Sequence, residues 1–349
     1  TPPPPPPPPP PPRLDSSAAS DVYKRQIVAR RGKVVHFSTH GEMDVAKGRA
    51  MEPDAIYMMA SSAKPVISVA TLMLVDEGLI GLHDPVSKYI PAFADIKVAI
   101  PLESADGSAS EKKGKDKEKD WGKKEDVEYR LVAVETPITI HHLLTHTSGL
   151  TNSGMEPAPD DNLVTFVPKL AEAPLMFQPG TRWAYGNEAI HLVLPCIIEI
   201  VSGIPFSEFM QERLFEPLAM DNSYFKVPSD KYSQLVVLEC SDNEKAKGKG
   251  KGKGWGGLSS SAEDFLHFEQ MLLNGGELFG NRVLSPATVK MMSSNQVGDL
   301  FATAYGGEKE QKGMGFGYAV AVTLDPIAAG NYRGKGAFGW GGVAGTVSW

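Results

Sequence analysis

Cysteine is almost absent from this chain, with two residues, Cys196 and Cys240, among 349. Two cysteines are too few for the disulfide framework of a small secreted domain. No apolar run approaches the length of a membrane-spanning helix. Positive charge is not in excess either, and the net charge of -7 argues against a general nucleic-acid binder. What the chain does have is a hydrophobic content of 42%, enough to fill a sizeable core.

Several catalytic signatures are also missing. The chain has no Gly-x-Ser-x-Gly elbow, which disfavours a hydrolase of the α/β-hydrolase type, and it has neither a His-Glu-x-x-His zinc helix nor a P-loop. His141, His142 and His146 form a small cluster, but no nearby carboxylate or cysteine completes a metal set. We therefore predict no metal site and no cofactor, and we expect His146 to make structural hydrogen bonds in a turn.

The ends of the chain and two internal segments have unusual compositions. Residues 1–12 are almost all proline, and residues 21–26 match the translation of an adapter used in DNA library preparation, so we expect residues 1–26 to be a non-native or disordered leader. This leaves the localisation unknown. Two low-complexity inserts, 103–128 and 244–254, are rich in lysine and are expected to be solvated loops. The remainder, residues 27–349, is predicted to be a single domain.

The apolar pattern predicts helices between terminal strands. Residues 66–75 are apolar on all sides and predict a buried helix that ends near Gly78. Strands at both chain ends with helices between them fit an antiparallel sheet closed by the N- and C-terminal strands, plus a helical insertion. The other predicted elements are strands at 27–30, 34–39, 315–324 and 336–349, and helices at 140–144, 188–201 (bent at Pro195, capped by Gly203), 206–220 and 261–274.

A serine and a lysine stand at the start of the buried helix, as Ser61-Ser62-Ala63-Lys64. Three residues make about one helical turn, so Ser61 and Lys64 share a face. A serine hydroxyl is a weak nucleophile until a base takes its proton, and a lysine can be that base when burial lowers its pKa. The alternative interpretation is an N-cap serine followed by a surface lysine. The same Ser-x-x-Lys spacing recurs at 110–113 and 223–226, without a buried helix behind it.

Further motifs follow in order along the chain. With the first one, the segments are Met59-Ala60-Ser61-Ser62-Ala63-Lys64-Pro65, Leu143-Leu144-Thr145-His146-Thr147-Ser148-Gly149-Leu150, Pro179-Gly180-Thr181, Tyr185-Gly186-Asn187, Glu216-Pro217-Leu218-Ala219-Met220 and Gly256-Gly257-Leu258-Ser259-Ser260-Ser261-Ala262. Together they resemble the class C β-lactamase-like and penicillin-binding-protein-like serine hydrolases. That group includes carboxylesterases, D-stereospecific peptidases and acyltransferases besides the β-lactamases.

The resemblance implies a fold and a set of roles. The fold would be α/β (α+β) of the β-lactamase/transpeptidase type, with an antiparallel sheet flanked by helices and a mostly helical subdomain. Ser61 would be the acylated nucleophile and Lys64 its base partner. Tyr185 would shuttle the proton, although alone it reads as an aromatic anchor in a turn. Asn187 would position Lys64 and the substrate, although alone it is an ordinary helix N-cap.

The last motif departs from the β-lactamase pattern. Many β-lactamases and transpeptidases carry Lys-Thr-Gly where this chain has Trp340-Gly341-Gly342, which resembles the esterase branch. Trp340 has the alternative interpretation of plain packing on an edge strand. The oxyanion hole would be the backbone N–H groups of Ser61 and Val343. The resemblance also implies a further strand and a C-terminal helix, so we expect the chain to be C-terminally truncated.

The resulting prediction is a serine hydrolase that cleaves a small-molecule ester or amide substrate, with carboxylic esters favoured, through an acyl-enzyme on Ser61. β-Lactamase activity and D-peptidase or transpeptidase activity are the enzymatic alternatives. A catalytically inactive relative that acts as a binding or scaffold protein is the non-enzymatic one. The sequence names neither the substrate nor the oligomeric state.

Overall fold

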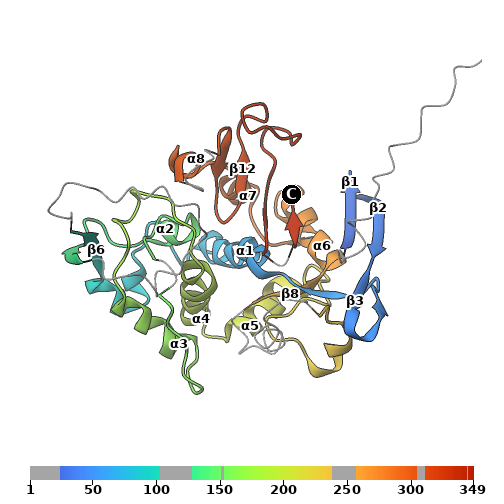
Figure 1. Cartoon of the computed structure of the whole chain (residues 1–349), viewed down its shortest axis with the longest axis horizontal. Helices are drawn as coiled ribbons and strands as arrows, with labels where there is room; N and C mark the ends of the chain where they lie inside the picture. Colours follow the sequence, from blue (N-terminus) through green and yellow to red (C-terminus); the bar gives the residue numbers. More distant parts are fainter. Residues whose placement is uncertain (1–23, 103–127, 151–152, 238–256, 305–310, 344) are drawn as a thin grey trace, which may run out of the picture.

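The computed structural model describes residues 24–102, 128–150, 153–237, 257–304, 311–343 and 345–349. These residues surround the central helix α1 (Ala63–Asp76), which lies between a helical region and a region of short strands (Figure 1). The predicted leader lies outside the described residues except for residues 24–26, which begin strand β1 (Lys24–Arg30). The insert 244–254 lies wholly outside them, and the insert 103–128 does so except for residue 128.

Helix α1 confirms the predicted buried helix. Every residue from Ala63 to Leu74 is buried, and Gly78, at φ +72°, follows the end of the helix. Burying one large apolar side chain contributes about 1.5–3 kcal/mol, so α1 is a major part of the core. The expected start was slightly wrong, because Ser61 lies in a 3₁₀ turn, η2 (Ala60–Ser62), that precedes α1. The turn keeps Lys64 one turn beyond Ser61.

The helical region contains the second apolar helix, which runs without a break over Ala189–Ser202, close to the predicted 188–201. It begins as a π-helical turn, η7 (Ala189–Val193), and continues as α4 (Leu194–Ser202), with Pro195 directly after the change from π to α geometry. Gly203 ends α4 at φ +74°, as predicted. The other elements of this region are α2 (Ile140–Leu144), which has its predicted bounds, α3 (Leu163–Phe166), α5 (Phe206–Met210) and the π-helical turn η8 (Gln211–Phe215).

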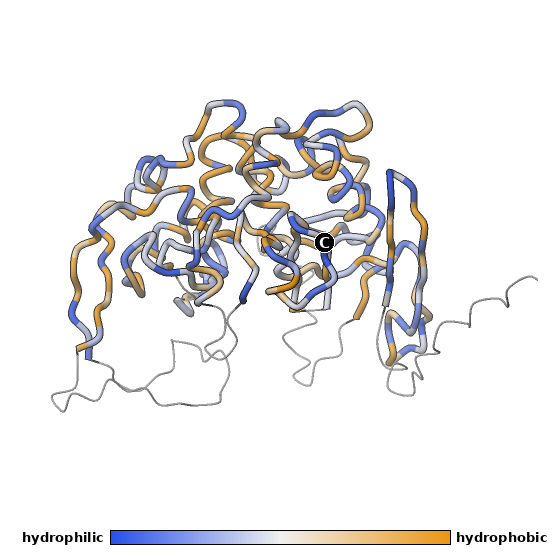
Figure 2. Tube along the Cα trace, turned by 90° about the horizontal axis from the view of Figure 1, so that it is seen from above, coloured by the Kyte–Doolittle hydropathy of each residue, from blue (hydrophilic) through white to orange (hydrophobic). Residues whose placement is uncertain are grey.

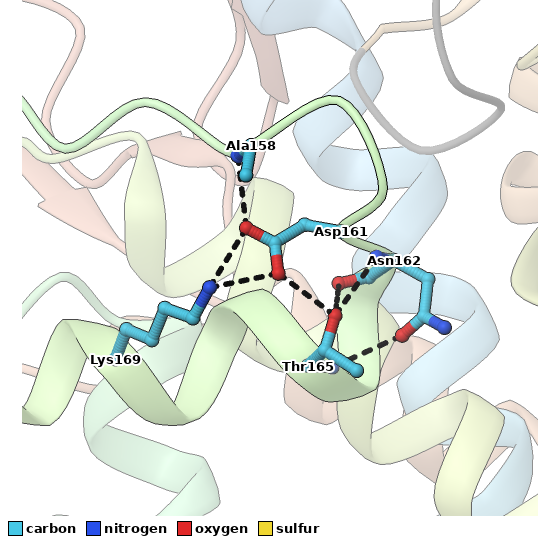
Figure 3. Close-up of polar contacts among 5 residues, drawn as sticks. All are labelled: Ala158, Asp161, Asn162, Thr165 and Lys169. Atoms are coloured by element: carbon cyan, nitrogen blue, oxygen red, sulfur yellow. Dashed lines mark hydrogen bonds and ion pairs between the residues drawn. The ribbon is translucent and has the colours of Figure 1, made fainter.

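The N-terminus of α3 is held by a local polar cluster (Figure 3). Asn162 Oδ1 accepts a hydrogen bond from the Thr165 N–H, and the Thr165 hydroxyl accepts one from the Asn162 N–H, so the two residues form a capping box. The ammonium group of Lys169 lies 2.8 and 2.9 Å from the two carboxylate oxygens of Asp161. These contacts fix a short helix whose own backbone bonds are few.

The named strands pair in antiparallel fashion, but within the described residues they form six small sheets instead of the single closed sheet that the sequence suggested. Among the strands that the structure describes, those of the N-terminal hairpin pair only with each other. The hairpin packs on α6 (Ala262–Leu273), whose bounds match the prediction within one residue (Figure 1). The two-stranded sheets are β1 with β2 (Lys33–His40), β3 (Glu42–Asp44) with β4 (Arg49–Ala50), β5 (Ile56–Met58) with β8 (Ser259–Ser261), β6 (Lys97–Pro101) with β7 (Tyr129–Ala133), and β9 (Glu277–Leu278) with β10 (Asn281–Arg282).

The C-terminal strands form a four-stranded meander in the order β11 (Met314–Phe316), β12 (Ala321–Thr323), β13 (Phe338–Gly341) and β14 (Val347–Ser348). Each of the two long strands predicted here is a hairpin. The first reverses at Gly317, where a Cβ atom would lie 2.0 Å from the Met292 carbonyl oxygen, and Ala319 in the same turn has φ +60°. Helices α7 (Pro286–Met292) and α8 (Leu300–Ala304) precede the meander.

Hydrophobic positions run through the central helices, whereas the β1–β2 hairpin at one side mixes polar and apolar positions (Figure 2). Within the described ranges, no single helix has both the length and the apolar character needed to cross a bilayer. The bent pair Ala189–Ser202 and Phe206–Phe215, with 84° between its halves, meets that test only when its two helices are taken together.

Candidate active site

Ser61 lies on a tightly held turn between β5 and α1. Strand β5 pairs with β8, and the Met59 N–H donates to the Leu258 carbonyl over 2.8 Å, which fixes the chain just before the turn. Ala60 adopts φ +47°, a left-handed conformation that costs a non-glycine residue about 1–2 kcal/mol. The turn therefore stores some strain to present Ser61 at the N-terminal end of the buried helix.

Lys64 is surrounded by three acceptors at hydrogen-bond distance. Its Nζ atom lies 3.2 Å from Ser61 Oγ, 2.7 Å from the Tyr185 hydroxyl oxygen and 2.8 Å from Asn187 Oδ1. The Tyr185 hydroxyl in turn donates to Ser61 Oγ over 2.6 Å. The structure thus brings together Ser61, Lys64, Tyr185 and Asn187, as the sequence predicted, and the surface-lysine alternative is wrong because Lys64 is 0% exposed.

Burial changes the acid–base behaviour of Lys64. Removal from water lowers the pKa of Lys64 to about 7 from an ordinary value of 10.5. The charged form is disfavoured because a buried ammonium loses its hydration shell, and its hydrogen-bond partners here are neutral oxygens. A large fraction of Lys64 is therefore neutral near pH 7 and has a lone pair available to accept a proton.

Tyr185 and Asn187 reach Lys64 from a loop that is fastened at several points. The Ala184 N–H donates to the His146 carbonyl over 3.0 Å. Next to Asn187, the buried carboxylate of Glu188 accepts hydrogen bonds from both the backbone N–H and the hydroxyl of Ser153. The loop is therefore anchored on both sides of the Tyr185-Gly186-Asn187 motif.

The third motif lies on β13, close to the Ser61 turn. The Trp340 ring lies 5.7 Å from the Tyr185 ring and 5.4 Å from the Phe316 ring, between centroids. β13 has a partner strand on each side, so the edge-strand interpretation of Trp340 was wrong. A Cβ atom on Gly342 would lie 2.4 Å from the Met59 carbonyl oxygen, so this close approach requires glycine. Gly341 ends β13, and the exposed Val343 follows Gly342.

The histidines have structural surroundings. His141 Nδ1 lies 3.2 Å from the Tyr318 hydroxyl, and His142 Nδ1 accepts from the Thr139 N–H. His146 lies in a turn at φ +57° with hydrogen-bonded backbone groups, yet its ring Nε2 is buried without a hydrogen-bond partner in the described part of the chain. Across that part, no three His, Cys, Asp or Glu side chains gather closely enough to hold a metal ion.

The other two Ser-x-x-Lys sequences lack this environment. Ser223 is buried and bonded to Ser260 Oγ and Asp264 Oδ2, each over 2.8 Å, and Ser110 lies outside the described residues. The sequence did not predict the packing of the His146 ring on Tyr185 or the contacts of Ser62 with Thr346. His146 and Ser62 lie in segments that resemble the family, which was the only sign in the sequence that they lie near the site. Nothing in the sequence indicated Thr346.

Comparison with known proteins identifies the family of this chain. The model of the beta-lactamase family matches residues 26–349, so the chain belongs to that family. Two of the similar proteins are Protein Rv1367c of Mycobacterium tuberculosis, 30% identical with 93% of this chain and 79% of the relative covered, and Esterase EstB of Burkholderia gladioli, 30% identical with 93% and 81% covered. Among solved structures, "EstCE1, a hydrolase with promiscuous acyltransferase activity" aligns with a TM-score of 0.68 at 24% identity, covering 91% of this chain and 82% of that one.

The family and the fold define the kind of protein. The chain has the β-lactamase/transpeptidase-like fold, in which helices accompany antiparallel strands. It is an enzyme of the β-lactamase-related serine hydrolases. The relatives of this chain in that group include two proteins that are named as esterases.

Proposed function

We propose that this enzyme hydrolyses carboxylic esters through an acyl-enzyme formed on Ser61. One observation carries the proposal: a fully buried lysine lies within hydrogen-bond distance of both a serine hydroxyl and a tyrosine hydroxyl that contact each other. Nucleophile and base within reach of one another are the geometric requirement for covalent catalysis by serine. The similarity to Esterase EstB supports esters as the substrate class.

In the first step, the Tyr185 hydroxyl turns from Ser61 Oγ to donate to the lone pair of neutral Lys64. Ser61 Oγ then attacks the ester carbonyl carbon while its proton passes to the Tyr185 oxygen, and Tyr185 gives its own proton to Lys64. The carbonyl oxygen becomes an oxyanion, which the N–H groups of Ser61 and Val343 stabilise. The C–O bond to the alcohol then breaks, and the alkoxide takes a proton back from the Tyr185–Lys64 pair. Water repeats the sequence on the acyl-enzyme and releases the carboxylic acid and free Ser61.

Trp340 favours esters over lactams. A binding site for the carboxylate of a β-lactam needs a cation or a hydroxyl at this position, and an indole ring supplies neither. The ring of Trp340, which lies beside Tyr185 and is backed by the buried Phe316, suits an uncharged acyl or alcohol group instead. An inactive binding protein is disfavoured. Burying a lysine beside a serine and a tyrosine costs folding free energy, and a protein that only binds a ligand has no need of this arrangement.

The test is covalent labelling. Wild-type protein is incubated with a fluorophosphonate probe and with p-nitrophenyl esters, and Ser61→Ala is expected to lose both labelling and hydrolysis by several orders of magnitude. Ser68→Ala is the matched control, because Ser68 is a buried serine on α1 whose hydroxyl has no hydrogen-bond partner in the described ranges. Labelling that persists in Ser61→Ala, or disappears in Ser68→Ala, would contradict the assignment of Ser61.

A further inference from the structure

A closed hydrogen-bond network joins the Ser61 turn to the loop after β13. The Thr346 hydroxyl donates to the Met59 carbonyl over 2.9 Å, and the Gly342 N–H donates to the Thr346 carbonyl. Ser62 Oγ lies 3.0 Å from Thr346 Oγ1 and 3.3 Å from the Thr346 carbonyl oxygen. Ser62 and Thr346 are 284 residues apart in the sequence.

The hydroxyl proton of Thr346 has two acceptors within reach. These are the Met59 carbonyl, which also accepts from the Ser62 N–H, and Ser62 Oγ. With either acceptor, the Ser62 hydroxyl can donate to the Thr346 carbonyl oxygen. Because each donor has an acceptor and Ser62 is 1% exposed, the network is a satisfied, largely buried connection between two backbone segments.

The two connected segments carry the two N–H groups that we assign to the oxyanion hole. Ser61 lies between Met59 and Ser62, and Val343 lies between Gly342 and Thr346, so the network brackets both groups in sequence. Gly342 packs so closely on the Ser61 turn that a Cβ atom would lie 2.4 Å from the Met59 oxygen and 2.5 Å from Thr346 Oγ1. The separation of the two backbones is thus set by direct contact and by the hydroxyl of Thr346.

We propose that Ser62 and Thr346 are positioning residues that hold the Ser61 and Val343 N–H groups at the spacing that a tetrahedral oxyanion requires. This rests on the proposed function of Ser61. An oxyanion hole works because its donors are fixed before the charge develops, and an error of about 1 Å in such a site can cost on the order of a hundredfold in rate. Neither side chain touches the substrate in this role.

The principal variant is Thr346→Val, which keeps the branched shape and removes the hydroxyl. The expected result is a fall in kcat of about tenfold to a hundredfold with KM changed by less than about threefold, because the oxyanion exists only in the transition state. Thr346→Ser, which retains the hydroxyl, is expected to recover most of the activity. Ser62→Ala serves as a second variant if Thr346→Val folds poorly, and the double variant is expected to lose less than the product of the two single losses.

A thionoester substrate separates this role from a purely structural one. Sulfur is larger than oxygen and a weaker acceptor of N–H bonds, so a well-formed oxyanion hole favours the ester over the matching thionoester. Thr346→Val is expected to lower the ratio of ester to thionoester kcat/KM, with unchanged far-ultraviolet circular dichroism. An unchanged ratio, wild-type kcat in Thr346→Val, or no recovery in Thr346→Ser would overturn the proposal. Ser61→Ala, measured alongside, tests the proposed function separately, since only that function predicts complete loss of labelling.

Discussion

The imidazole ring of His146 lies against the phenol ring of Tyr185, with 4.9 Å between the ring centroids. Trp183 and Phe316 contact the same imidazole, at 5.7 and 5.6 Å, so the histidine fills the space behind Tyr185. Burial and the neighbouring charge of Lys64 hold the pKa of His146 well below its ordinary value, so the ring is neutral at neutral pH. His146 therefore supports Tyr185 by packing and adds no positive charge next to Lys64.

His146→Ala is expected to lose both stability and activity. Removing a buried ring leaves a cavity that costs about 2–5 kcal/mol, and Tyr185 loses the surface that orients its hydroxyl. Thermal unfolding and ester kcat measure the two effects. His36→Ala, which removes an exposed ring on β2, is the control and is expected to change neither by more than a small amount. A destabilised His146→Ala enzyme with wild-type kcat would contradict the supporting role.

The rate of ester hydrolysis is expected to rise with pH through about 7. In the proposed mechanism neutral Lys64 is the base. Its pKa is lowered to about 7, so the neutral fraction grows from about one tenth at pH 6 to about nine tenths at pH 8. His146 and His191 have pKa values well below the ordinary one and add no ionisation in this range. A profile of kcat/KM from pH 5.5 to 9 measures the inflection, and enzyme returned from pH 5.5 to pH 8 must regain full activity. A flat profile between pH 6 and 8.5 would rule out Lys64 as the base.

Lys64→Met is expected to be inactive yet more stable than wild type at pH 7 and below. In the folded state the pKa of Lys64 is about 7, whereas in the unfolded chain it is ordinary, so the unfolded state binds more protons between about pH 7 and 10.5. The stability contribution of Lys64 is complete above the unfolded pKa and is lost as the pH falls through the folded one. The advantage of Lys64→Met in the free energy of unfolding should shrink as pH rises, by at most about 1.4 kcal/mol per pH unit. Urea denaturation at pH 7, 8.5 and 9.5 tests this, and a constant difference would contradict the buried-base interpretation.

Short-chain esters are expected to be far better substrates than a chromogenic cephalosporin. The missing charge-assisted bond to the lactam carboxylate is worth about 1.5–3 kcal/mol, which corresponds to a loss of roughly tenfold to a hundredfold from this contact alone. The ratio of kcat/KM for a p-nitrophenyl ester and the cephalosporin measures it. Comparable values for the two substrates would refute the ester assignment that rests on Trp340.

Much of this fold and site follows from local sequence. The helix behind Ser61 and the helix 140–144 were predictable because apolar runs and end signals act within a few residues. The ordered motifs predicted that Lys64, Tyr185 and Asn187 would meet at Ser61, and their hydrogen bonds agree.

Other features depend on contacts between distant segments. The meander was not predictable as four strands because its first reversal, between β11 and β12, depends on packing of Gly317 against Met292. The inner position of Trp340 requires knowing both partners of β13. The contacts of Thr346 join residues that are 284 and 287 positions apart in the sequence. No local sequence pattern predicts a contact over that separation.

Because Lys64 is buried only in the folded chain, the reactivity proposed for Ser61 depends on folding. In an unfolded chain the same lysine is exposed and protonated, Tyr185 is elsewhere, and Ser61 is an ordinary alcohol. The proposed reactivity of Ser61 therefore requires that the segments near residues 61, 146, 185 and 340 have assembled. Covalent labelling by a fluorophosphonate probe added during refolding would therefore measure that assembly. A nascent or misfolded chain is expected to remain unlabelled.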